Sequence, residues 1–241
     1  MPNPTHNKRP INARKIIGIV ILIILGLSVI YTALRLITLP ADSLTPEGRS
    51  LRQDYVLALL QCLGGFVIMF VPTFLDKRYK IVVPDKIQIM YFIFLFLAIY
   101  LGEVQNFFYR VPFWDNILHA FSGGMLAIIG ILLVNILNGQ EKLHLQLSPF
   151  FVVLFGASFA VLLGVVWEIY EFAADGLLGT NMQKFMRFDG ELLVGHAALA
   201  DTMIDLIVDL GSAVIVGTLA YFSLKSEAAA REEQKEKVEQ V

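Results

Sequence analysis

The chain has 241 residues, of which 56% are hydrophobic and 17% charged, with a net charge of −2. Its mean hydropathy of +0.67 is too high for a soluble domain of this size, and the absence of a basic stripe interleaved with aromatic residues argues against nucleic acid as a partner. The single cysteine, Cys62, lies in an apolar run and excludes an internal disulfide or a thiolate metal cluster.

Six apolar segments follow one another, each near the ~20 residues that a helix needs to cross a lipid bilayer. The predicted spans cover residues 16–39, 54–75, 86–107, 114–137, 148–174 and 201–224. Proline and glycine residues separate them, and the first is too long for the core of a signal peptide. We therefore predict an all-α polytopic membrane protein with six transmembrane helices. A short segment (1–15) precedes the transmembrane domain (16–224), and a charged tail (225–241) follows it.

Basic residues are distributed unequally between the two sides of this predicted bundle. The side that holds both termini carries Lys8, Arg9, Arg14, Lys15, Lys77, Arg78, Lys80, Lys86, Lys142, Lys225, Arg231, Lys235 and Lys237. The other side carries Arg49, Arg52, Arg110, Lys184 and Arg187. The positive-inside rule therefore predicts that both termini are cytoplasmic.

With this orientation, eight carboxylates fall in the outer half of the membrane: Glu103, Asp115, Glu168, Glu171, Asp175, Asp201, Asp205 and Asp209. A charged side chain costs about 2.5–3.5 kcal/mol at the centre of a membrane helix, so such residues are usually kept for function. Residues three, four or seven apart share a helix face, which aligns Asp115 with His119 and Asp205 with Asp209. We expect the acidic faces of the last three spans to converge, with glycines at close helix contacts: Gly123, Gly124, Gly156, Gly164, Gly211 and Gly217.

The expected counter-ions of these acids are His119, Arg35 and Arg110, which leaves an excess of negative charge. Three outcomes stay open. A divalent metal ion could bind, some carboxyls could stay protonated, or the acids could line a water-filled cavity for a cationic or polyhydroxyl substrate. Asp201 could equally be an N-cap of the sixth span, whereas Asp205 and Asp209 lie too deep for capping.

The polar residues of the last four predicted spans and their loops occur in five sequence blocks: Glu103, Trp114-Asp115-x-x-x-His119-x-x-Ser122-Gly123, Trp167-Glu168-x-x-Glu171-x-x-x-Asp175, Met182-Gln183, and Asp201-Thr202-Met203-x-Asp205-x-x-x-Asp209-x-Gly211. In these blocks the chain resembles the YjdF-like group of uncharacterised bacterial inner-membrane proteins, which implies a location in the bacterial cytoplasmic membrane. A fainter resemblance is to VanZ-like proteins, which are associated with glycopeptide (teicoplanin) resistance. It implies a role in the cell envelope.

The first hypothesis for the function is an enzyme at the outer leaflet that acts on a lipid or lipid-linked cell-envelope substrate. The candidate metal ligands are His119, Asp115, Glu168, Asp205 and Asp209. Glu171 is the candidate general base, and His119 and Asp115 are its catalytic neighbours. The candidate substrate-binding residues are Arg35, Arg110, Asp175, Gln183 and Asp201.

Two alternatives stay open, a transporter or proton-coupled carrier and a non-catalytic membrane scaffold or sensor. The loop over residues 176–200 is expected to be an interfacial helix or a lid over the site.

Overall fold

The structure is a computed structural model that describes residues 13–40, 42–44, 50–138, 147–187 and 191–239. Its helices are α1 (Ala13–Thr38), α2 (Leu51–Ile68), α3 (Val71–Tyr79), α4 (Asp85–Leu95), the π-helix η1 (Phe96–Val104), α5 (Phe107–Arg110), α6 (Trp114–Asn138), α7 (Pro149–Leu178) and α8 (His196–Glu239). Six helical segments among the described residues are long and apolar enough to cross a membrane, which confirms the predicted fold class. Some residues used for the predicted orientation lie outside the described ranges: Lys8, Arg9, Arg49 and Lys142.

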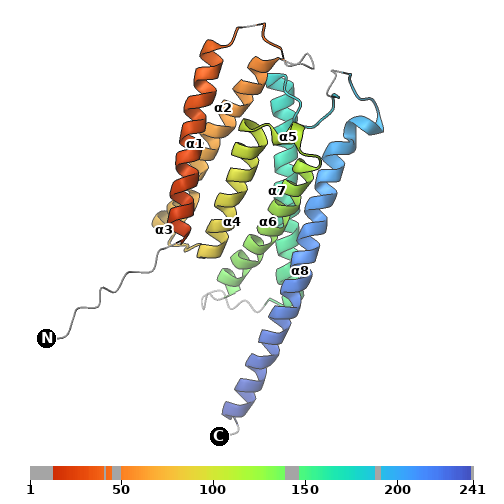
Figure 1. Ribbon diagram of the computed structural model, residues 1–241. Helices are drawn as coiled ribbons and strands as arrows, with labels where there is room; N and C mark the ends of the chain where they lie inside the picture. Colours follow the sequence, from red (N-terminus) through yellow and green to blue (C-terminus); the bar gives the residue numbers. More distant parts are fainter. Residues whose placement is uncertain (1–12, 41, 45–49, 139–146, 188–190, 240–241) are drawn as a thin grey trace, which may run out of the picture.

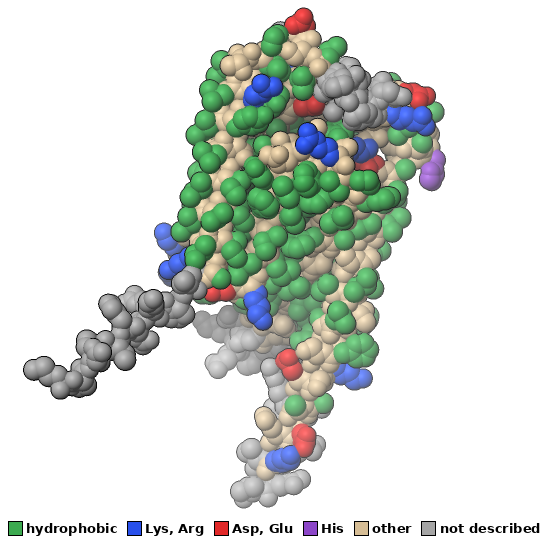
Figure 2. Space-filling model, in the orientation of Figure 1, with side chains coloured by type: hydrophobic (Ala, Val, Ile, Leu, Met, Phe, Trp, Pro, Cys, Tyr) green, Lys and Arg blue, Asp and Glu red, His purple; other side chains and the backbone are tan. Residues whose placement is uncertain are grey.

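The helices form two groups of three that stand side by side (Figure 1). One group consists of α1, α2 and the continuous α4–η1 segment, and the other of α6, α7 and α8. The groups meet where α4 and η1 pack against α6, with the short α5 between η1 and α6. Hydrophobic side chains cover the middle of the bundle, and charged side chains gather toward its two ends (Figure 2).

The start of α1 and the end of α8 lie at the same end of the bundle (Figure 1). We call this the termini end and the opposite one the site end. At the termini end, Arg14 of α1 forms an ion pair with Asp85 of α4 at 3.1 Å. The charged tail continues α8 as a helix through Glu239. The membrane side that each end faces stays a prediction.

The second span is two helices, because Pro72 lies inside the apolar run. Proline lacks a backbone N–H and cannot continue a helix, but it fits the first turn of a new one. The chain turns after α2, and α3 restarts with Pro72 in its first turn. It ends at Tyr79, and the next residue, Lys80, has a φ of 59° in the left-handed region. The helical segment therefore extends beyond the predicted range 54–75 to Tyr79.

Small residues pack α6, α7 and α8 tightly on the side of the termini. Ala127, Ala160 and Ala213 are fully buried against one another. A Cβ atom at Gly130 would lie 2.8 Å from the Cα of Gly156, so the two backbones touch at this point. The expected contact at Gly156 is thus confirmed. At Gly211 the same expectation is wrong, because a Cβ atom there would meet none of the described residues within 4 Å.

Candidate functional site

His119 is a buried residue on α6, and carboxylates surround its imidazole ring at the site end. Its Nε2 atom lies 3.9 Å from oxygens of three carboxylates, those of Asp115, Glu168 and Asp205. Its Nδ1 atom lies 3.2 Å from an oxygen of Asp209. The structure therefore brings together, from three helices, all five residues that the sequence suggested as metal ligands.

Two of the oxygens that face Nε2 are buried and have no hydrogen-bond partner among the described residues. They are Oε1 of Glu168 and Oδ2 of Asp205, whose residues are 4% and 1% exposed. A buried polar atom without a partner is costly, and each such atom in a folded protein calls for an explanation. Two ligands that each lie about 2.1 Å from one ion are at most about 4.2 Å apart. The 3.9 Å separations from Nε2 fit a shared cation between His119, Glu168 and Asp205.

The second oxygen of each of these two carboxylates is held by a side-chain amide. Asn116 donates a hydrogen bond from Nδ2 to Oδ1 of Asp205 at 3.0 Å. Gln183 donates from Nε2 to Oε2 of Glu168 at 3.4 Å and to Oγ1 of Thr202 at 3.0 Å. These amides leave the free oxygens directed at His119. Groups that orient metal ligands in this way tune metal affinity.

Asp209 lies behind the imidazole ring, on the side of Nδ1 rather than Nε2. A carboxylate in this position fixes the tautomer and orientation of a metal-binding histidine. Two glycines make room for it. A Cβ atom at Gly164 of α7 would collide with the Asp209 carboxylate, and one at Gly123 of α6 would lie 2.8 Å from the backbone oxygen of Asp209.

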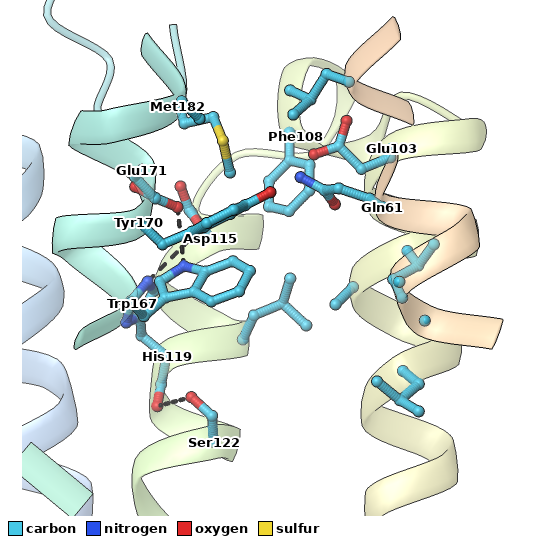
Figure 3. A pocket seen from close by; sticks show the side chains of 18 of the residues that line it. Gln61, Glu103, Phe108, Asp115, His119, Ser122, Trp167, Tyr170, Glu171 and Met182 are labelled. Atoms are coloured by element: carbon cyan, nitrogen blue, oxygen red, sulfur yellow. Dashed lines mark hydrogen bonds and ion pairs between the residues drawn. The ribbon is translucent and has the colours of Figure 1, made fainter. Parts of the chain in front are cut away.

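Glu171 lines a cavity next to Asp115 and His119 (Figure 3). The indole Nε1 of Trp167 donates a hydrogen bond to Oε1 of Glu171 at 2.9 Å. Glu103 lines the same cavity from the other helix group, near the end of η1, with Gln61 of α2 beside it (Figure 3). The π-helix has no sequence signal. It is a rare conformation that occurs frequently at functional sites.

The loop between α7 and α8 is organised by Asp175 and forms no helix over its described residues, 179–187 and 191–195. The Asp175 carboxylate accepts hydrogen bonds from the hydroxyl of Thr180 and from the backbone N–H groups of Met182 and Gln183. Asn181 exchanges two further hydrogen bonds with the backbone of Met186. The predicted interfacial helix is therefore wrong for these residues, because the loop folds inward toward the site.

Lys184, at the turn of this loop, is the counter-ion that the sequence analysis missed. Its Nζ atom lies 3.2 Å from Oδ2 of Asp115 and 2.8 Å from the backbone oxygen of Met182. Burial by itself would lower the pKa of Lys184, but the carboxylates of Asp115, Asp201 and Glu171 outweigh burial and raise the pKa above its usual value. The sequence signal for this residue is only its place after the Met182-Gln183 pair.

The remaining candidate substrate-binding residues, Arg35, Arg110 and Asp201, lie in three different parts of the structure. Arg35 is exposed on α1 and donates a hydrogen bond to the hydroxyl of Tyr55 at 3.1 Å, and Arg110 is exposed at the end of α5. Among the described residues, neither arginine is ion-paired with the carboxylates around His119. Asp201 lies near Asp115 and Asp205, and its oxygen Oδ2 is buried without a partner among the described residues. Because α8 begins at His196, the interpretation of Asp201 as an N-cap is wrong.

The fold and the site define a multi-pass membrane protein with a histidine and several carboxylates buried between its last three long helices. The chain belongs to the family described as "Predicted membrane protein (DUF2238)", which it matches over residues 16–226, a range that includes every residue of the cluster. An uncharacterized protein of Thermotoga maritima is 29% identical over 167 residues, which cover 68% of this chain and 78% of the relative. No solved structure is significantly similar to the chain.

Proposed function

We propose that this protein is a metal-dependent enzyme of the bacterial cytoplasmic membrane. In this proposal it acts at the outer leaflet on a lipid or lipid-linked cell-envelope substrate. The observation that carries the proposal is the pair of buried, unpartnered oxygens on Glu168 and Asp205, both 3.9 Å from Nε2 of His119. A divalent cation between the three residues would give each of these oxygens a partner and offset part of the negative charge.

The ligand set indicates which ions the site would hold. Imidazole together with carboxylates suits zinc, iron and manganese better than the all-oxygen sites typical of calcium and magnesium. Three protein ligands leave a position for water or substrate, as in catalytic rather than structural zinc sites. Such an ion polarises a carbonyl or phosphoryl oxygen and lowers the pKa of a bound water. Asp115, 3.9 Å from Nε2 of His119, is placed to act as a fourth protein ligand, which still leaves an open position on an ion that takes five or six ligands.

The residues around the cation site can take distinct roles. Glu171 lies in the cavity next to His119, held by Trp167, and is the candidate to accept a proton from an attacking group. Asp209 orients His119 from behind, and Lys184 balances Asp115. Asp175 contributes by holding the loop that carries Gln183 and Lys184.

The tight packing of α6, α7 and α8 on the termini side of the site, together with the apolar lining of the cavity between α2, α6 and α7, favours an enzyme over a carrier. A transported ion would need a polar path from the carboxylates to the termini end. Between α6, α7 and α8 that direction is filled by Ala127, Ala160 and Ala213, all fully buried. One turn further along α6, the backbones of Gly130 and Gly156 touch and leave no space for an ion between α6 and α7.

The proposed sidedness rests on the distribution of basic residues and the position of the site. Both described chain ends lie at the end opposite the carboxylates (Figure 1). By the positive-inside rule the end with both described chain ends is the cytoplasmic one, which supports a site that faces outward. The resemblances to YjdF-like and VanZ-like proteins support a bacterial inner membrane and an envelope substrate.

Metal analysis of the purified protein tests the proposal. The full chain and its Glu168→Gln, Asp205→Asn and His119→Gln variants are stripped with chelator, incubated with zinc or manganese, desalted and analysed by mass spectrometry for metal. We expect about one ion per wild-type chain and a loss of affinity of at least about 10–100-fold in each variant. Glu233→Gln, at an exposed tail residue of α8, is the matched control and should bind like wild type. Equal metal content in all five proteins, or none in wild type, would contradict the proposal.

A further inference from the structure

A cavity of about 860 Å³ lies between the two helix groups and begins at the carboxylates. Its walls run from Asp54 to Ile68 on α2, from Asp115 to Ile129 on α6 and from Leu163 to Leu178 on α7. At ~1.5 Å of rise per residue, these stretches are about 21 to 23 Å long. One leaflet of a bilayer core is about 15 Å thick, so the cavity is long enough to accommodate a chain that crosses a whole leaflet.

The polarity of the cavity changes along its length. Its charged residues gather at the site end, where Glu103, Asp115, Glu171 and Lys184 line it. Toward the termini end the lining is apolar, and this part includes Ile68, Phe94, Leu95, Met125, Leu126 and Ile129. Near that far end the Tyr91 hydroxyl is satisfied by a hydrogen bond to the backbone oxygen of Ile68 at 2.6 Å. A cavity with a polar end and a long apolar body matches a molecule with a polar head and a hydrocarbon chain.

Exposed residues of both α2 and α7 line the cavity, which indicates that it opens between these two helices. On α2, Leu60, Gly64 and Ile68 line it and are exposed. On α7, Trp167 and Tyr170 line it and are 44% and 41% exposed. Figure 3 shows both rings reaching from α7 toward α2 across this gap. In a bilayer this surface faces the acyl chains, so a lipid chain can enter sideways without crossing water.

We propose that the cavity binds the hydrocarbon chain of a membrane amphiphile, which enters between α2 and α7 and places its head group beside Glu171 and Lys184. This inference names the substrate class of the proposed enzyme and depends on that proposed function for the chemistry at the head group. The occupant is a lipid of the surrounding leaflet rather than a second protein, because the cavity is long and apolar with one charged end, and because residues that line it on α2 and α7 are exposed.

Gly64 offers a way to fill the cavity without disturbing the bundle. A Cβ atom at Gly64 would meet no atom of the described part of the chain within 4 Å, so a larger side chain projects into open space. Gly211 of α8 is the matched control, because a Cβ atom there also meets nothing within 4 Å in the described ranges, and because the residue is exposed and does not line the cavity. Leu163→Trp fills the cavity from α7, the opposite wall.

Photo-crosslinking tests the inference on the full chain in nanodiscs. The probe is a lysophosphatidylglycerol with a diazirine at the end of its acyl chain, and cross-linked peptides are mapped by mass spectrometry. We expect cross-links near Ile68 and Ile129, competed by excess unlabelled lysophosphatidylglycerol. Labelling should fall by roughly tenfold or more in Gly64→Leu and in Leu163→Trp, because the new side chains displace several methylenes of the probe. It should be unchanged in Gly211→Leu.

The same preparations are analysed for metal and for monodisperse elution, which separates this inference from the proposed function. Two results would overturn the lipid site and leave the metal proposal intact, provided that the wild-type protein binds metal. The first is equal labelling of wild type and all variants, and the second is labelling confined to α1 and α8. Labelling that unlabelled lipid does not compete would show contact with bulk lipid only and would overturn it as well. If the protein binds no metal, but its labelling is competed by unlabelled lipid and lost in Gly64→Leu, the result would support the lipid site and contradict the metal proposal.

Discussion

The helices α6, α7 and α8 pack by different means at their two ends. Toward the termini end, Ala127, Ala160 and Ala213 bring them into close contact, and the backbones touch at Gly130 and Gly156. At the site end the same three helices present carboxylates to one another around His119. Carboxylates in a bilayer repel and are poorly solvated, so they cannot hold helices together by themselves. The comparison indicates that the closely packed end supplies the rigidity that keeps the acidic end assembled.

Overpacking the closely packed end should have the largest effect. Gly130→Val forces a branched side chain against the backbone of Gly156 and should destabilise the protein by about 3 kcal/mol. Thermal unfolding in detergent, followed by the loss of monodisperse protein, measures the change. Gly211→Val is the matched control, with no neighbour within 4 Å, and should lie within about 1 kcal/mol of wild type. Equal stability of the two variants would show that the packed end is not what holds the three helices.

A divalent ion should stabilise the acidic end in wild type and not in Glu168→Gln. An ion at 100 times its dissociation constant stabilises the folded protein by about 2.7 kcal/mol. Without metal, Glu168→Gln should be the more stable of the two proteins, because it removes one of several like charges around His119. Thermal unfolding with zinc, with manganese and with chelator measures both effects. Metal-free wild type that is more stable than metal-free Glu168→Gln would indicate a self-sufficient polar network instead.

The span pattern and the acidic faces could be read from the sequence, because both depend on local periodicity. The hydropathy of the apolar segments predicts six membrane-spanning helical segments, and a four-residue spacing aligns Asp205 with Asp209 on one helix face. The sequence did not predict the π-helical turn that carries Glu103 or the position of Lys184, since these follow from packing and loop geometry. The sequence also did not predict the role of Asn116, whose side-chain amide on α6 donates a hydrogen bond to Asp205 on α8.

Loosening the loop over the acidic end should have a smaller, local effect. Asp175→Asn removes one of the two carboxylate oxygens that together accept hydrogen bonds from Thr180, Met182 and Gln183. We expect a loss of about 1.5 kcal/mol, which corresponds to roughly tenfold faster hydrogen exchange in residues 180–187. Thr180→Val removes only one of these bonds and should accelerate exchange less. Unchanged exchange in Asp175→Asn would contradict the role of Asp175 in holding Lys184.

The smallest effect is expected from the two exposed arginines, which lie outside the comparison of the two ends. Arg35 contacts Tyr55 and Arg110 is exposed at the end of α5, and within the described ranges neither forms an ion pair with the carboxylates around His119. Arg35→Gln and Arg110→Gln should leave stability within about 0.5 kcal/mol of wild type and leave metal content unchanged. Labelling by the lysophosphatidylglycerol probe tests whether either residue binds the head group, as the sequence suggested. A loss of labelling of about tenfold, without loss of metal, would show that an arginine outside the cavity contributes to binding the substrate. The head group would then extend beyond Lys184 toward the membrane surface.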